Sequence, residues 1–337
     1  MDETPRPYDP DQPLELDPDP VAQWLDWEEQ ANLVGFRTST QPVEIDVVSV
    51  PREQLEVHIL PAAPEAIISR FIQGDRVLFP RHPLNTDPTV AWFDAPVSER
   101  WTARFTSSRT LARIDPLLEP LAEVALVTEV LVVLAAGGES GFMVRDLRLF
   151  QDGHYYLPAL SIPFVGRQIA RACGEPFDAF WGCHFAEIVG RVKARLFVRY
   201  GLWFETPNPQ NILVQLGASL RPTGMLVFRD VGDGECATDV ELVRDGPWTR
   251  LVSDLRPETQ GSFWAFGEAG DRSVDTATLE RWYGLHDDAY FGELAEWFPE
   301  LAPALSVSGY ARLEHWNATL RTADAASAIA LAFARRR

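Results

Sequence analysis

The stretch FETPNPQNILVQLGASLRPTGMLVFRDVGDG, residues 204–234, determines the fold expected for this chain. It holds two apolar pieces, NILVQL and GMLVFR, on either side of a turn that contains glycine, serine and proline. Such a pattern predicts a β-hairpin. Polar side chains gather just before the first piece and just after the second. They are Glu205, Asn208, Gln210 and Asn211 on one side and Arg229, Asp230 and Asp233 on the other. Because antiparallel strands bring these two positions together, we expect amides, carboxylates and an arginine at one end of the hairpin.

The elements around the hairpin predict an α+β fold. Residues 182–201 place apolar side chains at helical spacing, which predicts a helix that ends at Gly201. Strand-like pieces come earlier, around 42–60, 76–80, 99–114 and 143–151, with short helices at 21–36 and 64–73. Residues 117–136 are apolar and fit either a helix or two strands. Residues 275–335 contain helix-like pieces. This order lacks regular βαβ alternation and favours an antiparallel sheet with a helical C-terminal part.

Composition suggests three sections of the chain. Residues 1–20 are rich in Asp and Pro and are expected to form a disordered acidic leader. Residues 21–150 form an N-terminal α+β part that carries the sequence SSRT. Residues 151–337 contain the helix, the hairpin and the helical C-terminus.

The net charge of −19 argues against DNA or RNA as a partner, since these need a basic face. No run of 18 apolar residues predicts a membrane span, and the first residues do not resemble a signal peptide. Three cysteines without a CxxC pair fit a reducing cytoplasm, so we expect a cytoplasmic protein. Lys193 is the single lysine, so any anion site must use arginines, amides or helix ends. Five scattered histidines lack ligand spacing and are expected to be structural or exposed: His58, His154, His184, His286 and His315.

The hairpin end has the chemistry of a magnesium–nucleotide site. Mg²⁺ prefers amide, carboxylate and phosphate oxygens, so Asn211 and Asp230 could hold it, with Arg229 balancing phosphate charge. Loop amides also cap turns, and arginine–carboxylate pairs are often structural, so both interpretations stay open. The glycine-rich loop and strand lysine of protein kinases are absent, as are the Walker A, GxSxG and HExxH motifs.

The stretches YGLWFETPNPQNILV and VFRDVGDG resemble the signature of the IucA/IucC family, the NRPS-independent siderophore synthetases. The matching positions are Tyr200, Gly201, Glu205, Gln210, Asn211, Arg229 and Asp230. In the same order, VLFPRHPLNTDP resembles a strand that ends in His-Pro, here His82 and Pro83. The segment TSSRTLA resembles the family's phosphate segment. The resemblance covers about residues 75–240 and implies the siderophore synthetase fold, with a distantly kinase-like nucleotide site.

The resemblance implies ATP and Mg²⁺ as cofactors and a reaction that adenylates a carboxylate and passes it to an amine or hydroxyl. Arg109, Asn208 and Asp230 would be catalytic, and Asn211 and Asp230 would hold the metal. The residues implied to bind the nucleotide are Ser107, Ser108, Thr110, Glu205, Gln210, Asn211 and Arg229.

The sequence departs from the family pattern in four ways. Asn208 stands where the family has a histidine, and an extra residue separates Glu205 from Gln210 and Asn211. The stretch PLAEVALVTEVLVVL lacks the lysine and arginine that follow the family's phosphate segment, and Arg145 and Arg148 are the nearest replacements. The chain is also much shorter than full family members.

The function expected is an ATP-dependent carboxylate–amine or carboxylate–hydroxyl ligase in siderophore-like biosynthesis and iron acquisition. One alternative is a degenerate family member that acts as a binding or partner protein, and a weaker one is a kinase-like phosphotransferase. The expected partners are small molecules, with neither nucleic acid nor membrane, and a homodimer is one open arrangement.

Overall fold

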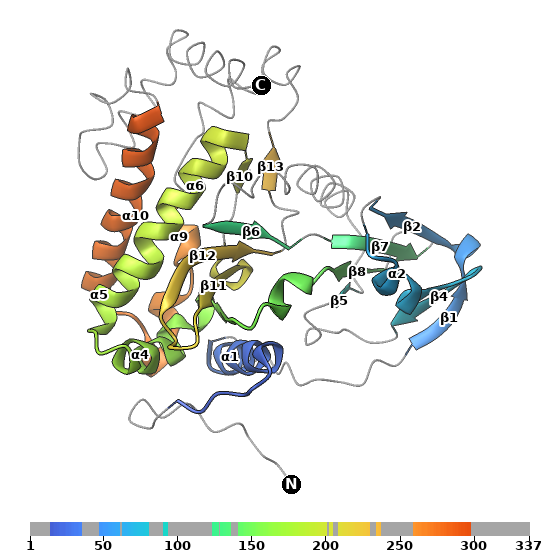
Figure 1. The fold of residues 1–337 in the computed structure, drawn as a ribbon, viewed down its shortest axis with the longest axis horizontal. Helices are drawn as coiled ribbons and strands as arrows, with labels where there is room; N and C mark the ends of the chain where they lie inside the picture. The colour runs from blue at the N-terminus through green and yellow to red at the C-terminus, as the bar shows by residue number, and fades with distance from the viewer. Residues whose placement is uncertain are drawn as a thin grey trace. The chain divides into compact units, whose positions relative to one another are not determined.

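The computed structural model describes residues 14–35, 47–60, 63–80, 90–93, 123–127, 129–135, 141–200, 202–204, 208–229, 234–236 and 259–297. The chain divides into two compact units that are each discontinuous in sequence. Unit 1 comprises residues 1–168 and 210–233, and unit 2 comprises residues 169–209 and 234–337. Figure 1 shows the helices and strands of both.

Unit 1 contains the predicted hairpin. Strands β11 (Ile212–Leu216) and β12 (Pro222–Phe228) pair antiparallel, which confirms the prediction. They form the centre of a four-stranded sheet in the order β6-β12-β11-β9. Strand β9 (Tyr155–Pro158) pairs antiparallel with β11, whereas β6 (Val124–Leu126) pairs parallel with β12.

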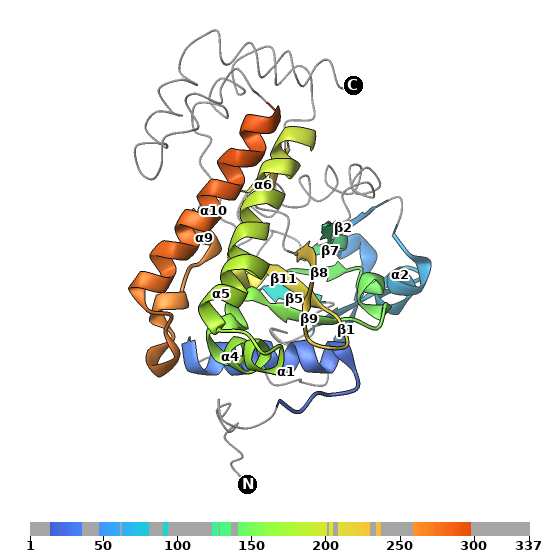
Figure 2. The ribbon, with the colours of Figure 1, turned by 60° about the vertical axis from the view of Figure 1, so that its left-hand side comes forward.

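Helix α1 (Pro20–Gly35) packs against the β9 side of this sheet (Figure 2). Trp24, Trp27 and Ala31 of α1 are buried, at the spacing of one helix face. Trp24 joins a core cluster with Tyr156, Leu213 and Val227. The sequence therefore predicted this amphipathic helix correctly, and its buried face fixes the helix to the sheet.

Two further sheets of unit 1 enclose a second core. Strands β1 (Val47–Pro51), β4 (Arg76–Pro80) and β3 (Ile72–Gln73) form one, in that order. The other has the order β2-β7-β8-β5 and consists of β2 (Leu55–Ile59), β7 (Glu129–Ala135), β8 (Gly141–Arg145) and β5 (Val90–Phe93). Helix α2 (Glu65–Phe71) adds Phe71 to this core, where it contacts Phe142. Residues 117–136 fitted either a helix or two strands, and their described parts form the two strands β6 (Val124–Leu126) and β7.

Helices dominate unit 2. Helix α4 (Ile162–Ala172) runs into it, and α5 (Phe177–Trp181) is followed by a π-helical turn over Gly182–Ala186 that leads into α6 (Glu187–Tyr200). Helix α10 (Thr276–Trp297) lies beside α6 (Figures 1 and 2). The shorter elements of this unit are β10 (Leu202–Phe204), β13 (Gly234–Cys236) and α9 (Thr259–Ser262), and β10 pairs antiparallel with β13.

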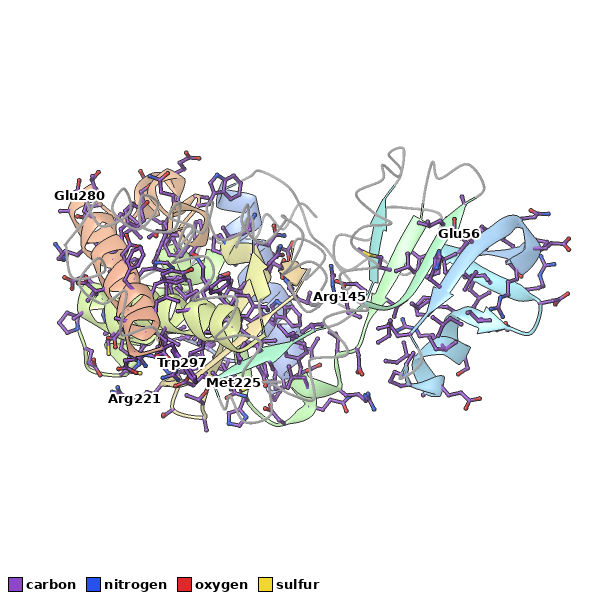
Figure 3. The ribbon with its side chains drawn as sticks, turned by 90° about the horizontal axis from the view of Figure 1, so that it is seen from above. Glu56, Arg145, Arg221, Met225, Glu280 and Trp297 are labelled. Carbon is purple, nitrogen blue, oxygen red and sulfur yellow. The ribbon has the colours of Figure 1, made fainter. Side chains whose placement is uncertain are left out.

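Helix α10 is one continuous helix within the region 275–335, where the sequence indicated helix-like pieces. Thr278, Trp282, His286, Tyr290 and Leu294 recur every four residues and are all buried. Asp275 caps the start, since its Oδ1 accepts a hydrogen bond of 2.9 Å from the amide of Thr278. Figure 3 labels Glu280 and Trp297 near the two ends of this helix. None of the helices in the described part of the chain is long and apolar enough to span a bilayer.

Candidate functional site

The open end of the β11–β12 hairpin brings together some of the residues selected from the sequence. Ile212 pairs with Phe228, and one step further the amide of Arg229 donates a 2.9 Å hydrogen bond to the carbonyl of Asn211. The backbone pairing of β11 with β12 thus continues one residue beyond β12, to Arg229. Asn211 and Arg229 lie opposite each other, as the sequence predicted.

A short 3₁₀ turn, Pro209–Asn211, leads into β11. Pro209 is buried, while Gln210 and Asn211 are half-buried at the start of the strand. Asn208 is half-buried too and immediately precedes the turn in unit 2. A proline at the start of this turn has its φ already fixed near the helical value, which favours the turn at this position.

Arg229 is almost fully buried and is held on three sides. Its Nε donates a 3.0 Å hydrogen bond to the carbonyl oxygen of Gln210, and its second terminal nitrogen lies 2.5 Å from Oε1 of Glu28. The guanidinium also stacks over the Trp24 ring, 5.1 Å from its centroid. The structural interpretation of Arg229 therefore has direct support in unit 1, and its contact with phosphate stays a prediction.

Glu28 and Trp24 were missed by the sequence analysis. The signal for Glu28 is its position: it lies four residues after Trp24 and three before Ala31, on the buried face of α1. A carboxylate on such a face needs a partner, because an unpaired buried charge is strongly unfavourable. The sequence could not identify that partner, which lies 201 residues away.

Six of the predicted site residues lie outside the described residues. They are Ser107, Ser108, Arg109, Thr110, Glu205 and Asp230. Their roles stay predictions, as does the role of Asn208. In the described part of the chain, no group of three or more His, Cys, Asp or Glu side chains forms a metal site.

The arginines named as replacements for the missing family cations each lie beside a carboxylate. Arg145, labelled in Figure 3, ends β8, and its Nε is 3.6 Å from Oε1 of the buried Glu129. Arg148 is largely exposed and forms a 2.6 Å ion pair with Asp146. The hydrogen bond from Arg148 to Asp146 raises the pKa of the arginine further.

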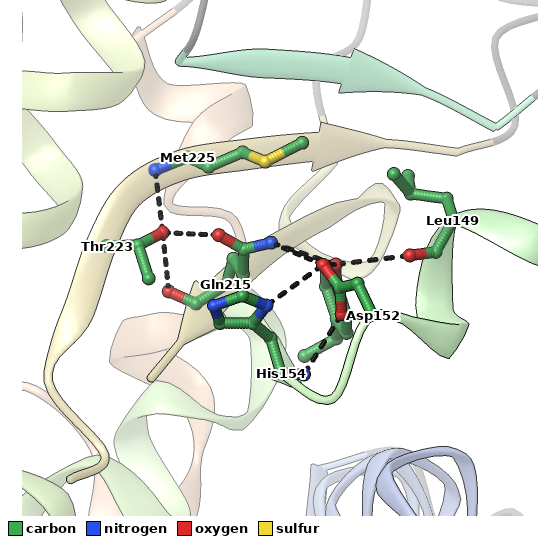
Figure 4. Close-up of polar contacts among 7 residues, drawn as sticks. Leu149, Asp152, His154, Gln215, Thr223 and Met225 are labelled. Atoms are coloured by element: carbon green, nitrogen blue, oxygen red, sulfur yellow. Dashed lines mark hydrogen bonds and ion pairs between the residues drawn. The ribbon is translucent and has the colours of Figure 1, made fainter. Parts of the chain in front are cut away.

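A second polar cluster lies at the other end of the hairpin (Figure 4). Oδ2 of Asp152 accepts hydrogen bonds from the Tyr156 hydroxyl at 2.7 Å and from Nε2 of Gln215 at 3.0 Å. Thr223 donates to Oε1 of Gln215, and His154 lies 3.0 Å from the Asp152 carboxylate. Burial raises the pKa of Tyr156 well above its ordinary value. Partial burial raises the pKa of Asp152, but the bonds that it accepts outweigh this and lower it. The cluster ties β9, β11 and β12 together beside the irregularity between Val214 and Leu216.

Unit 2 contains a third polar cluster, which is buried. Nζ of Lys193 donates a 3.0 Å hydrogen bond to Oγ of Ser262 and lies 3.3 Å from Nε2 of His286. Because an ammonium group only donates, Nε2 must accept, which leaves the proton on Nδ1. Nδ1 then faces Oδ1 of Asp287 at 3.1 Å. Burial and the neighbouring Lys193 lower the pKa of His286 to about 4.

No protein-family model matches the sequence, and no curated protein matches it. Solved structures do match it. Aerobactin synthetase IucA from Klebsiella pneumoniae is 16% identical over 82% of this chain and 71% of its own, with a TM-score of 0.51.

Two further solved structures have a similar fold. The ATP-bound structure of the same synthetase is 14% identical over 80% of this chain and 64% of its own, with a TM-score of 0.51. The petrobactin biosynthesis protein AsbB from Bacillus anthracis is 12% identical over 86% of this chain and 65% of its own, with a TM-score of 0.54. The chain therefore spans about two thirds of the length of these proteins. At such low identity the likeness concerns the fold: this chain, with its antiparallel sheets and helical C-terminal part, is folded like aerobactin synthetase IucA and AsbB.

Proposed function

We propose that this protein is an ATP- and Mg²⁺-dependent ligase. It joins a small carboxylate to an amine or hydroxyl through an acyl-adenylate, in the assembly of a siderophore-like metabolite. The observation that carries the proposal is the open hairpin end, where the Arg229 amide bonds to the Asn211 carbonyl, in a fold like that of aerobactin synthetase IucA. A structure of that synthetase is ATP-bound.

The donor groups of this chain suit the cofactors. Asn211 and Asp230 offer an amide and a carboxylate oxygen, which are hard ligands of the kind that Mg²⁺ prefers. Ser107, Ser108, Arg109 and Thr110 would contact the phosphates, and Glu205, Gln210 and Arg229 would complete the nucleotide site. Bound ATP would supply activation of the carboxylate, with pyrophosphate as the leaving group.

The protein's own residues would position the reactants and stabilise charge. Arg109 brings a permanent positive charge to the phosphates. Asn208 stands where the resembling family has histidine. Its amide would donate a hydrogen bond to a phosphate but would carry no positive charge. Arg229 already balances Glu28, so it adds less net positive charge to the site than an unpaired arginine would.

Carboxylate-dependent exchange of labelled pyrophosphate into ATP tests the proposal, with a panel of polycarboxylates as substrates. The wild-type protein should catalyse exchange with at least one of them. Asp230→Ala should lower the rate about 10²–10³-fold, the usual effect of removing one charge-stabilising group. Asp178→Ala, which removes an exposed carboxylate in unit 2, is the matched control and should leave the rate unchanged.

The alternatives give different products. A degenerate binding protein, favoured by Asn208 and by the missing family lysine, should be stabilised thermally by MgATP yet show no exchange with any carboxylate. A kinase-like phosphotransferase should release ADP in place of AMP. ADP formation, or no exchange across the whole panel, would contradict the ligase.

A further inference from the structure

The carboxylate of Glu28 closes a buried contact between helix α1 and the open hairpin end. Both of its oxygens are used: Oε1 faces Arg229 at 2.5 Å, and Oε2 accepts a 2.9 Å hydrogen bond from Nε1 of Trp24. Glu28, Arg229 and Trp24 are 9%, 7% and 1% exposed. Water therefore screens this ion pair little.

Arg229 in turn connects the two chain segments of the hairpin end. Its backbone amide bonds to the Asn211 carbonyl at 2.9 Å, and its Nε bonds to the Gln210 carbonyl at 3.0 Å. One residue thus holds both the turn before β11 and the end of β12. Asn211 belongs to the first segment, and Asp230 directly follows Arg229 in the second.

We propose that Glu28, acting through Arg229, is a positioning residue for the magnesium–nucleotide site, because it fixes the spacing between the segments that carry Asn211 and Asp230. This inference rests on the proposed function. Both Glu28 oxygens are used by Arg229 and Trp24, so Glu28 would act on this site through Arg229. Its role would resemble that of residues that hydrogen-bond to metal ligands and hold them in place. Removal of such a residue lowers metal affinity about 10–100-fold.

The proposal differs measurably from a purely electrostatic role of Glu28. If Glu28 only offsets the positive charge of Arg229, Glu28→Gln should free that charge for phosphate and leave MgATP affinity equal or make it tighter. If Glu28 positions the site, Glu28→Gln should weaken MgATP binding about tenfold or more.

The first measurement is hydrogen exchange on the ligand-free full chain. In Glu28→Gln, the Arg229 amide should exchange at least about tenfold faster, because the variant breaks a buried ion pair. The Gly217 amide, which bonds to the Arg221 carbonyl at the closed end of the hairpin, should keep its protection. Equal acceleration at both ends would show a general stabilising role and overturn the proposal.

The matched control is Tyr156→Phe, which removes the hydroxyl of a buried tyrosine from the polar cluster at the closed end of the same hairpin. It should destabilise the hairpin, but the Arg229 amide should not be accelerated more than the Gly217 amide. Arg229→Lys serves as a second variant should Glu28→Gln not fold. It can keep the charge beside Glu28 but lacks the Nε–H that bonds to Gln210, and should accelerate exchange at its own amide in the same way.

The second measurement is the MgATP titration of each variant by calorimetry, with Mg²⁺ varied at fixed ATP. We expect weaker binding in Glu28→Gln and unchanged binding in Tyr156→Phe. Unchanged or tighter binding in Glu28→Gln overturns the proposal. If the wild-type protein binds no MgATP, the proposed function fails, while the exchange experiment still decides whether Glu28 holds the hairpin end.

Discussion

His286 is fully buried in unit 2 and lies 3.3 Å from Lys193, and this environment should make the unit sensitive to acid. The groups around the imidazole are Lys193, Asp287, Ser262 and Thr259. Burial, then Lys193, lower the pKa of His286 from 6.5 to about 4. Between these values the unfolded chain binds a proton that the folded chain does not, so stability is complete above pH 6.5 and falls as pH drops toward 4.

This linkage predicts a loss of roughly 3 kcal/mol of unfolding free energy between pH 7 and pH 4 from His286 alone. Urea unfolding of the wild-type protein and of His286→Gln at both pH values measures it. The variant should lose less stability on acidification, because its side chain does not titrate. Parallel pH profiles of wild type and His286→Gln would contradict the prediction.

At the scale of elements, Gly190 sets how closely α6 approaches α10. A Cβ atom at this position would lie 2.2 Å from the carbonyl oxygen of His286, which is backbone and cannot move aside easily. Gly190→Ala should therefore lower stability by about 2 kcal/mol or more, although alanine is the better helix former.

The control is Gly284→Ala in α10, where a Cβ would meet nothing within 4 Å. It should be neutral or stabilising by up to about 1 kcal/mol, since only helix propensity changes. Chemical denaturation of both variants measures the difference. A Gly190→Ala protein as stable as wild type would show that the two helices do not meet as closely as described.

Local pattern predicted the elements whose signals lie within a few residues. The hairpin followed from its apolar pieces and turn, and α1 from its buried face of Trp24, Trp27 and Ala31. The parallel pairing of β6 with β12 could not be predicted, because the two strands are about 100 residues apart and local sequence pattern does not indicate which distant strands pair. In the site, the hairpin placed Asn211 opposite Arg229, but the Glu28 partner depends on tertiary contact. The roles of Arg109 and Asp230 stay predictions.

At the scale of the whole molecule, the four-stranded sheet of unit 1 is formed by two stretches of chain that are separated in sequence by residues 169–209 of unit 2. Strands β6 and β9 lie before residue 169, and their neighbours β12 and β11 lie after residue 209. The amide of Val127 shows this dependence, since it bonds to the carbonyl of Phe228 at 2.8 Å. A chain that ends before β11 therefore lacks the partners that this sheet needs.

A comparison of two truncated chains tests this dependence. The chain 1–168 lacks β11 and β12, so the Val127 amide should exchange at nearly the unprotected rate. The chain 1–233 restores both strands and should recover protection at Val127, even though the segments of unit 2 after residue 233 are missing. Backbone pairing with β12 explains this recovery, since the acceptor at Phe228 is then present. Equal protection of Val127 in both truncated chains would show that β6 is held by contacts other than its pairing with β12.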